Sequence, residues 1–398
     1  MGSPGSTTMG HKDEWEVAFR QSKPILPLDV IYSIVAQLAD DIPSLRACSL
    51  VSKDFTRACR HFKWRRLVLD DRNKALTWVE RFRDVPGLRP YIKELGFNLV
   101  LMHDLYGVII FCQILKLFSG ALDNVRALDI CRVILRQTSF VLVPFIHSFK
   151  NGFKSVTRLT MEDIQLPISI LHTVLGSLKN LTEFRFHRLV IDLEGNPEHN
   201  LPQQLGTLRL RKLWQGTVSC ANPDAPEFDF LGWISRIAPV DALRQLTVVR
   251  VITASHVIAV DQFIQRIGGN LEELELEWGS IPRNDATSWH KASTGTLPCL
   301  TLKHNHNVRC LRIHDPSNPF VYPLLDELPN PGNLRRVCFR MHFRSTQGDV
   351  RVRNKDYLAL DTLLSAKRFS NVEQWTSHLR RRNFNACSSR FTPEASFK

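Results

Sequence analysis

The 398-residue chain lacks paired cysteines and any long apolar run. Its nine cysteines stand singly, without a Cys-x-x-Cys pair, so the sequence predicts neither a disulfide framework nor a structural zinc site. Most of them lie in apolar segments, which indicates reduced, buried thiols in the cytoplasm, the nucleus or both. The longest apolar candidate, residues 99–117, is interrupted by charged side chains, and residues 1–20 are polar. We therefore expect no membrane span and no secretory leader.

Signatures of catalysis are missing as well. No G-x-G-x-x-G or G-x-x-x-x-G-K-[ST] loop follows a predicted strand, and no G-x-S-x-G elbow occurs. His304, His306, Cys310 and His314 do not have the spacing of zinc ligands. Residues 1–6 fit the N-myristoylation template, but a disordered Gly/Ser-rich leader has the same letters. We predict a protein that is not an enzyme and that needs no cofactor or metal.

Three short amphipathic helices are predicted within residues 25–70. Pro27 suits the first turn of the first helix, where its missing N–H costs nothing. Ser52 is placed to cap the third helix. The apolar side chains that recur at helical spacing are Ile31, Ile34, Val35, Leu38, Phe55, Cys59 and Phe62. A bundle of this size buries little apolar area alone, so it needs a partner or the rest of the chain.

This segment resembles the F-box family. In order and at nearly the usual spacing, it has the family's Leu26-Pro27 pair, an acidic Asp29, the turn Val51-Ser52-Lys53 and a terminal Trp64. Phe55 stands where many members have Trp. The resemblance implies that residues 23–70 bind a Skp-type adaptor, and through it a cullin and a RING subunit. By this resemblance the adaptor-binding residues are Leu26, Pro27, Ile31, Ile34, Leu38, Leu50, Val51, Phe55 and Trp64.

A short phrase recurs after the F-box-like segment: a turn residue, often Asn, followed by apolar-x-x-apolar-x-apolar. Its copies lie roughly 24 to 38 residues apart, which is longer and less even than the ~20–29 of regular leucine-rich repeats. The series is expected to start at Ile92 and to end at Trp375. The copies between them finish at Ile130, Met161, Phe186, Leu210, Val248, Leu276, Ile313 and Phe339.

Helix-like stretches separate these phrases, at residues 140–149, 168–178, 230–237, 257–267 and 357–364. The alternation predicts an α/β fold in which strand–helix units stack into an irregular leucine-rich-repeat-like solenoid, with a parallel sheet on its concave side. We expect a disordered leader at 1–22, the F-box at 23–70, the repeat array at 71–387 and a flexible tail at 388–398.

Charged residues occupy the positions of the phrase that face away from the core. They are Arg158, Arg185, His187, Arg209, Arg211, Glu273, Glu275, Glu277, Arg312, His314, Arg336 and Arg340. This basic, acidic, basic order has two interpretations. The charges pair between neighbouring strands in weak exposed bridges, or they bind an oppositely charged segment of a protein substrate.

The net charge of +13 is concentrated towards the C-terminus, where residues 331–398 contain 14 Lys and Arg against 5 Asp and Glu. A solvated end cap explains this excess better than a nucleic-acid site, because interleaved aromatic residues are missing. The sequence therefore favours a substrate-recognition adaptor of an SCF-type E3 ubiquitin ligase, located in the cytoplasm, the nucleus or both. Two alternatives stay open: an F-box scaffold that acts outside ubiquitination, and a nucleic-acid-associated protein that uses the basic C-terminal region.

Overall fold

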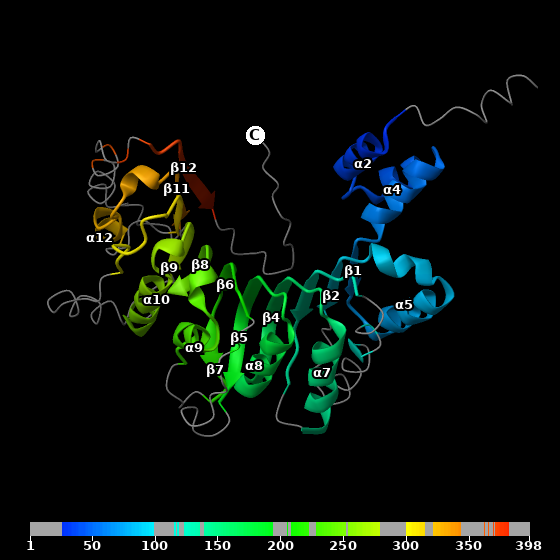
Figure 1. The fold of residues 1–398 in the computed structure, drawn as a ribbon, viewed down its shortest axis with the longest axis horizontal. Coiled ribbons are helices and arrows are strands. Elements are labelled where there is room, and N and C mark those ends of the chain that lie inside the picture. The colour runs from blue at the N-terminus through cyan, green and yellow to red at the C-terminus, as the bar shows by residue number, and fades with distance from the viewer. Residues whose placement is uncertain are drawn as a thin grey trace, which may run out of the picture.

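The computed structural model describes residues 26–98, 115–116, 118, 123–135, 139–193, 205, 208–222, 228–251, 254–278, 300–314, 321–343, 362, 365, 369 and 371–381. Over these residues a small group of helices is followed by an arch of strand–helix units (Figure 1). The expected leader at 1–22 and tail at 388–398 lie outside the described ranges. Within those ranges, no helix combines the length and apolarity needed to cross a bilayer.

The helical module consists of α2 (Leu28–Gln37), α3 (Ile42–Cys48) and α4 (Lys53–Lys63). Ser52 caps α4 by accepting a hydrogen bond from the Phe55 N–H at 3.3 Å, so the cap predicted from the sequence is confirmed. Asp41 caps α3 in the same way through the N–H of Ser44. The module has an apolar core of its own, separate from the core of the arch, formed by Ile31, Val35, Leu45, Ala58 and Cys59.

All described strands join one parallel sheet, which confirms the predicted α/β solenoid. Eleven of its twelve strands follow one another in chain order across the sheet. They are β1 (Arg66–Leu69), β2 (Glu94–Asn98), β3 (Ala127–Cys131), β4 (Arg158–Pro167), β5 (Glu183–Asp192), β6 (Lys212–Gln215), β8 (Gln245–Val251), β9 (Glu273–Trp278), β10 (Cys310–His314), β11 (Arg336–Phe343) and β12 (Gln374–Arg381). The twelfth, β7 (Val218–Cys220), pairs with β5.

The helices lie on the outer side of the sheet, which leaves the strands along the inner side of the arch (Figure 1). The α-helices are α5 (Arg72–Asp84), α7 (Ser139–Gly152), α8 (Ile168–Ser177), α9 (Phe230–Ile237), α10 (Ala254–Ile267) and α12 (Val321–Asp326). Short 3₁₀ turns occur at η1 (Pro86–Tyr91), η2 (Val240–Ala242), η3 (Gly268–Asn270) and η5 (Pro331–Asn333). The predicted helices at 140–149, 168–178, 230–237 and 257–267 coincide with α7 to α10. The one predicted at 357–364 lies outside the described residues, apart from Thr362.

In four of the repeats, the recurring Asn ties the repeat to the one before it. Four such side chains donate to a backbone carbonyl at the same turn of the preceding repeat: Asn180 to Lys154 at 2.8 Å, Asn307 to Gly269 at 2.6 Å, Asn333 to His306 at 2.8 Å and Asn371 to Gly332 at 3.1 Å. These bonds satisfy carbonyl groups that no strand pairs. The Asn that marks the phrase in the sequence therefore has a structural role.

Two boundaries of the array differ from the sequence prediction. The sheet begins one strand earlier than Ile92, because β1 pairs with β2 and its Leu67 and Leu69 are buried in the core of the arch. One copy of the phrase was predicted to end at Leu210, but the strand of that repeat is Lys212–Gln215, so the predicted end was wrong by five residues. The last inward position of this repeat is occupied by the polar Gln215. A phrase that requires an apolar residue there matches Leu205, Leu208 and Leu210 instead.

Candidate functional site: an exposed helical surface and a charged sheet

The helical module exposes apolar side chains to solvent. Leu50 and Val51, in the turn between α3 and α4, are 86% and 67% exposed. The other exposed apolar residues of the module are Leu26, Leu28, Val30, Ile34 and Ile42. We call these seven residues the apolar surface of the module. Exposed apolar residues gathered on so small a unit indicate a protein-binding surface.

The residues that the F-box resemblance implies for adaptor binding divide into two groups. Those with exposed side chains are Leu26, Pro27, Ile34, Leu50 and Val51. Leu38 and Phe55 are half-buried against the module's core. Ile31 is 2% exposed inside that core, so its expected contact with a partner is corrected to a role in folding the module. The apolar stripe of α2 has a buried side, with Ile31, and an exposed side, with Ile34. Helical periodicity alone does not distinguish the two sides.

Trp64 faces the arch. Its ring meets Trp78 of α5 edge-on at a centroid distance of 5.4 Å, and Trp78 in turn lies 5.3 Å from Phe82. The Lys63 ammonium group lies 4.6 Å from the Trp64 ring centroid. Trp64 therefore joins the module to the array, and because its side chain is only half-buried there, its expected contact with the adaptor stays a prediction. The exposed Leu28, Val30 and Ile42 were missed, although Val30 lies one helical turn before Ile34.

On the sheet, the acidic strand β9 is neutralised by its neighbours. Arg312 of β10 lies 3.7 Å from both Glu273 and Glu275, and Arg336 of β11 also reaches Glu273 at 3.7 Å. His314 lies 3.0 Å from Glu275 and 3.5 Å from Glu277. These contacts favour the interpretation in which charges pair between strands. Arg340, also expected on this face, is in backbone register with His314.

His314 is 5% exposed. Burial lowers the pKa of its imidazole, but the hydrogen bonds and charges of Glu275 and Glu277 outweigh burial, so the pKa is raised above its ordinary value of 6.5. At a pH below this raised pKa, the protonated ring bridges the carboxylates of Glu275 and Glu277.

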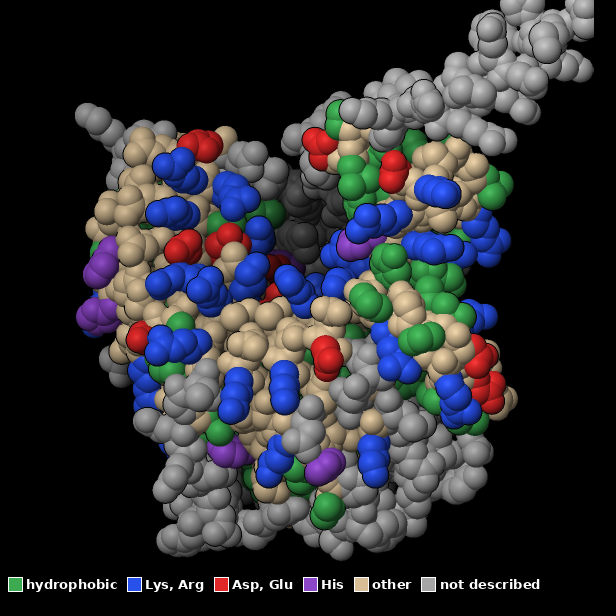
Figure 2. Space-filling view, turned by 45° about the vertical axis from the view of Figure 1, so that its right-hand side comes forward, with side chains coloured by type: hydrophobic (Ala, Val, Ile, Leu, Met, Phe, Trp, Pro, Cys, Tyr) green, Lys and Arg blue, Asp and Glu red, His purple; other side chains and the backbone are tan. Residues whose placement is uncertain are grey.

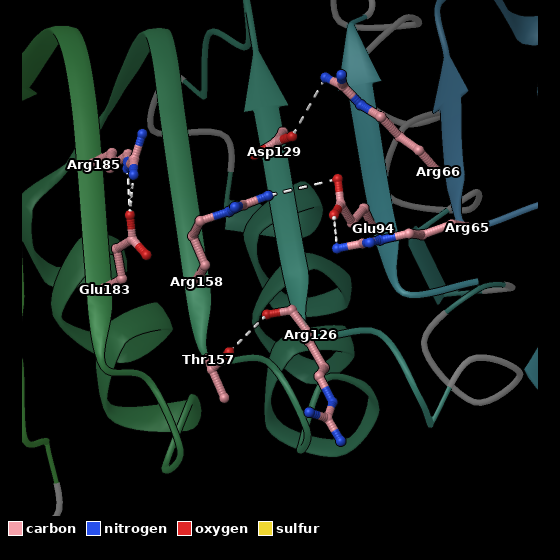
Figure 3. Close-up of polar contacts among 9 residues, drawn as sticks. All are labelled: Arg65, Arg66, Glu94, Arg126, Asp129, Thr157, Arg158, Glu183 and Arg185. Carbon is pink, nitrogen blue, oxygen red and sulfur yellow. Dashed lines mark hydrogen bonds and ion pairs between the residues drawn. The ribbon is translucent and has the colours of Figure 1, made fainter. Parts of the chain in front are cut away.

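The same pairing occurs on strands β1 to β5. Glu94 lies between Arg65 at 3.2 Å and Arg158 at 3.6 Å, as Figure 3 shows. Arg185 pairs with Glu183 on its own strand, and Arg66 lies 3.9 Å from Asp129 (Figure 3). Two of the expected substrate contacts, Arg158 and Arg185, are thus committed to internal ion pairs.

His187 lies in the middle of the sheet, with its ring 5.8 Å from that of Trp214. Burial is the main reason that its pKa is lowered, and the cations of Arg188 and Arg250 lower it further. A neutral His187 therefore contributes no charge of its own to attract a partner.

Arg209 and Arg211 lie before β6, so the expectation that they face out from a strand is corrected. Arg211 belongs to a row formed by the residue before each strand, in which each N–H bonds to the previous member's carbonyl. The basic members are Arg65, Lys93, Arg126, Arg211, Arg244, Arg309 and Arg335, and the acidic ones are Glu272 and Glu373. We call this the basic edge row. On the face that Figure 2 shows, Lys and Arg side chains are more prominent than Asp and Glu.

Only part of the basic edge row is compensated. Arg65, Arg244 and Arg335 pair with Glu94, Glu272 and Glu373. Among the described residues, no acidic group pairs with the other four members, which are Lys93, Arg126, Arg211 and Arg309. The pKa of Lys93 is lowered, first by partial burial and then by the charge of Arg126.

An open depression of about 760 Å³ lies at this edge. Six of its lining residues are Lys179, Thr182, Arg209, Arg211, Arg244 and Glu272. Arg209 and Arg211, which the sequence analysis placed on the open face of the sheet, thus lie together at its edge. The depression combines room for a peptide segment with an excess of positive charge.

Two observations on the described residues concern metal binding and the reactivity of thiols. Among these residues, no group of three or more His, Cys, Asp or Glu side chains is arranged to hold a metal ion. Burial raises the pKa of the Cys131 thiol to about 12, and it also raises the pKa of Cys310. These thiols are therefore protonated and poor nucleophiles.

The fold and its surfaces define a class of protein, an α/β solenoid of strand–helix repeats preceded by a helical module with exposed apolar residues. No protein-family model and no curated protein matches the sequence. Among solved structures, the chain is similar to the crystal structure of the Rad7 and Elc1 complex in yeast, with 12% identity and a TM-score of 0.36 over 82% of this chain and 87% of that chain. A similarity this low indicates nothing about function.

Proposed function

We propose that the protein is the non-catalytic, substrate-binding subunit of an SCF-type ubiquitin ligase, acting in the cytoplasm or nucleus. The helical module binds a Skp-type adaptor, which connects it to a cullin and a RING subunit. The repeat array holds a protein substrate. One observation carries the proposal: the turn with the F-box-like letters Val51-Ser52-Lys53 also contains the two most exposed apolar side chains of the module, Leu50 and Val51.

The energetics of docking agree with this assignment. Full burial of a Leu or Val side chain contributes about 1.5–3 kcal/mol, so an adaptor that covers Leu50, Val51 and Ile34 gains enough to offset part of the cost of association. The module already has its own core, so binding does not require it to fold first. Docking is then an association of formed surfaces, which keeps the entropic cost low.

For the substrate, we infer an acidic segment that lies along the basic edge row and in the depression beside it. The charges on the sheet face are largely used in internal pairs, whereas Lys93, Arg126, Arg211 and Arg309 have no acidic partner among the described residues. Uncompensated charge accelerates association and selects a partner of opposite sign. We therefore expect the basic edge row to select a substrate by its negative charge more than by its shape.

An affinity purification of the full chain, read by mass spectrometry, tests the ligase assignment. We expect a Skp-type adaptor together with a cullin. The double variant Leu50→Asp/Val51→Asp should lose both proteins, because it places two charges in the apolar interface. The matched control is Val143→Asp on α7, since Val143 is also 67% exposed but lies on the array.

The outcome separates the main proposal from its alternatives. Recovery of the adaptor without cullin would contradict the ligase role and support a scaffold role outside ubiquitination. Recovery of neither protein from the unchanged chain would contradict the assignment. Loss of both proteins in Val143→Asp as well would show that the effect is not specific to the helical module.

A further inference from the structure

Gln215 interrupts a column of apolar residues that is in register across strands β1 to β11, and in β12 the residue in register with this column is Ser377. The inward positions that close the repeats, in register across the strands, are Leu69, Phe97, Ile130, Met161, Phe186, Gln215, Val248, Leu276, Ile313 and Phe339. Gln215 is 7% exposed, and its Oε1 accepts no hydrogen bond from the described residues. A buried amide oxygen without a partner is unfavourable. A ligand that donates to it would explain its presence.

The sheet also opens beside Gln215. β6 ends at this residue, and the next strand, β7, pairs with β5 and not with β8. On the other side of the opening, the register between β8 and β9 shifts between Val249 and Val251. Arg250, at the shift, has a left-handed φ of 62°, and Arg132, Asp163 and Arg188 at the corresponding positions of earlier repeats are left-handed too, so this bend recurs along the array. The parallel ladder is thus interrupted at the carboxyl ends of β6 and β8.

A cavity of about 110 Å³ fills this interruption, between the strands and the helices α9 and α10. Its lining includes Gln215, Val218, Phe230, Val248, Arg250 and Ser255, together with His256 and with Asp229, whose carboxylate caps α9 by accepting a hydrogen bond from the Gly232 N–H at 2.8 Å. Most of this lining is apolar, with a few polar groups, as in small-molecule sites. In parallel α/β sheets such sites lie at the carboxyl ends of the strands.

We propose that this cavity binds a small hydroxycarboxylate with a branched apolar side chain. The hydroxyl group donates to Oε1 of Gln215. The carboxylate faces Arg250, which has no ion-pair partner among the described residues, and the first turn of the 14-residue α10, where Ser255 lies. A positive side chain and a helix N-terminus both favour an anion. The alkyl group packs against Val218, Phe230 and Val248.

The size of the cavity limits the ligand. A dry cavity of ~150 Å³ admits benzene, which has six non-hydrogen atoms, so this smaller space encloses the hydroxyl and branched alkyl groups of the ligand, and the carboxylate lies at its mouth beside the exposed Arg250. A ligand of that size binds with a Kd of about a millimolar, because each atom contributes little affinity. The site is independent of the proposed ligase role, since it lies on the helix side of the sheet and away from the helical module.

The test is a titration of the full chain, labelled at its Val methyl groups, with 2-hydroxyisovalerate. We expect saturable shifts of the Val218 and Val248 methyl signals. Isovalerate lacks the hydroxyl group and isobutanol lacks the carboxylate, so each should bind at least tenfold more weakly. Gln215→Leu should weaken 2-hydroxyisovalerate binding at least tenfold. Gln245→Leu, the same change on the open face of β8, should leave it unchanged.

A second variant keeps the test independent of any change in the core. Arg250→Asn removes the cation but suits the left-handed backbone, so it should weaken both carboxylates and leave isobutanol unaffected. The proposal is overturned if 2-hydroxyisovalerate shifts no methyl signal of the unchanged chain, or if it binds Gln215→Leu as well as the unchanged chain. Equal binding of isovalerate and 2-hydroxyisovalerate would also overturn it, because Gln215 would then make no hydrogen bond to the ligand.

Discussion

His314 is the side chain whose charge state matters most to the sheet. Its folded pKa is raised, so the stability it contributes is fully present below its ordinary pKa of 6.5 and is lost as the pH rises through the higher folded value. We predict that His314→Gln destabilises the protein more at about pH 5.5 than at about pH 8.5. Urea unfolding at the two pH values measures the difference. A loss of stability that is equal at both, or larger at the alkaline pH, would contradict the ion-pair assignment.

The ladder of asparagines predicts a second effect at the residue scale. Asn333→Ala removes the hydrogen bond to the His306 carbonyl, so it should lower the free energy of unfolding by about 1 kcal/mol. Asn330→Ala is the matched control, because the Asn330 side chain bonds to none of the described residues. Chemical denaturation of both variants measures the effect. Equal losses for the two would show that the ladder adds no stability.

Single residues also show where sequence reasoning stops. Helical spacing identifies Ile31 and Ile34 as one stripe, but it does not show that Ile31 is buried while Ile34 is exposed. The repeat template requires an apolar residue where Gln215 stands, so it misplaces Arg209 and Arg211. In both cases the position of the neighbouring helix or strand decides the outcome, and the local sequence pattern of a single element does not contain that information.

At the scale of elements, the helical module and the array have separate cores. Val35→Ala leaves a cavity in the module, whereas Leu69→Ala leaves one in the array, each at a cost of roughly 1–5 kcal/mol. Hydrogen exchange read by mass spectrometry should therefore show faster exchange only in residues 28–63 for Val35→Ala. For Leu69→Ala it should show faster exchange in β1 and β2. Faster exchange throughout the chain in both variants would mean that the two cores unfold together.

The elements themselves follow well from the sequence. A short alternating strand and a helix of eight residues or more have distinct periods, so α7 to α10 and most strands are predicted near their observed positions. The assignment of β1 is different, because its alternating Leu67 and Leu69 follow directly on the F-box-like letters. Only the pairing of β1 with β2 shows that it belongs to the array. Pairing is a long-range property, and local periodicity does not report it.

At the scale of the whole molecule, the net charge of +13 affects binding through the basic edge row, where part of the positive charge has no acidic partner among the described residues. We predict that Arg209→Glu/Arg211→Glu reduces recovery of an acidic substrate at least tenfold and makes the remaining binding less sensitive to salt. Adaptor binding should not change. The matched control is Arg83→Glu/Arg236→Glu, which alters the net charge equally at other exposed positions of the array. Affinity purification at two salt concentrations measures substrate recovery, its sensitivity to salt and adaptor binding.

Two results would contradict the proposed role of the basic edge row. Equal losses of substrate in both double variants would mean that only the net charge matters. Loss of the bound material on nuclease treatment would mean that the row attracts a nucleic-acid backbone, whose binding also depends steeply on salt.

The central claim is that the helical module binds a Skp-type adaptor, and titration calorimetry of the full chain with the purified adaptor tests it most directly. We predict a one-to-one complex with a Kd of about a micromolar or tighter. Leu50→Asp/Val51→Asp should weaken it at least tenfold, and Val143→Asp should leave it unchanged. The account is contradicted if the unchanged chain gives no binding heat, or if Leu50→Asp/Val51→Asp binds as tightly as the unchanged chain.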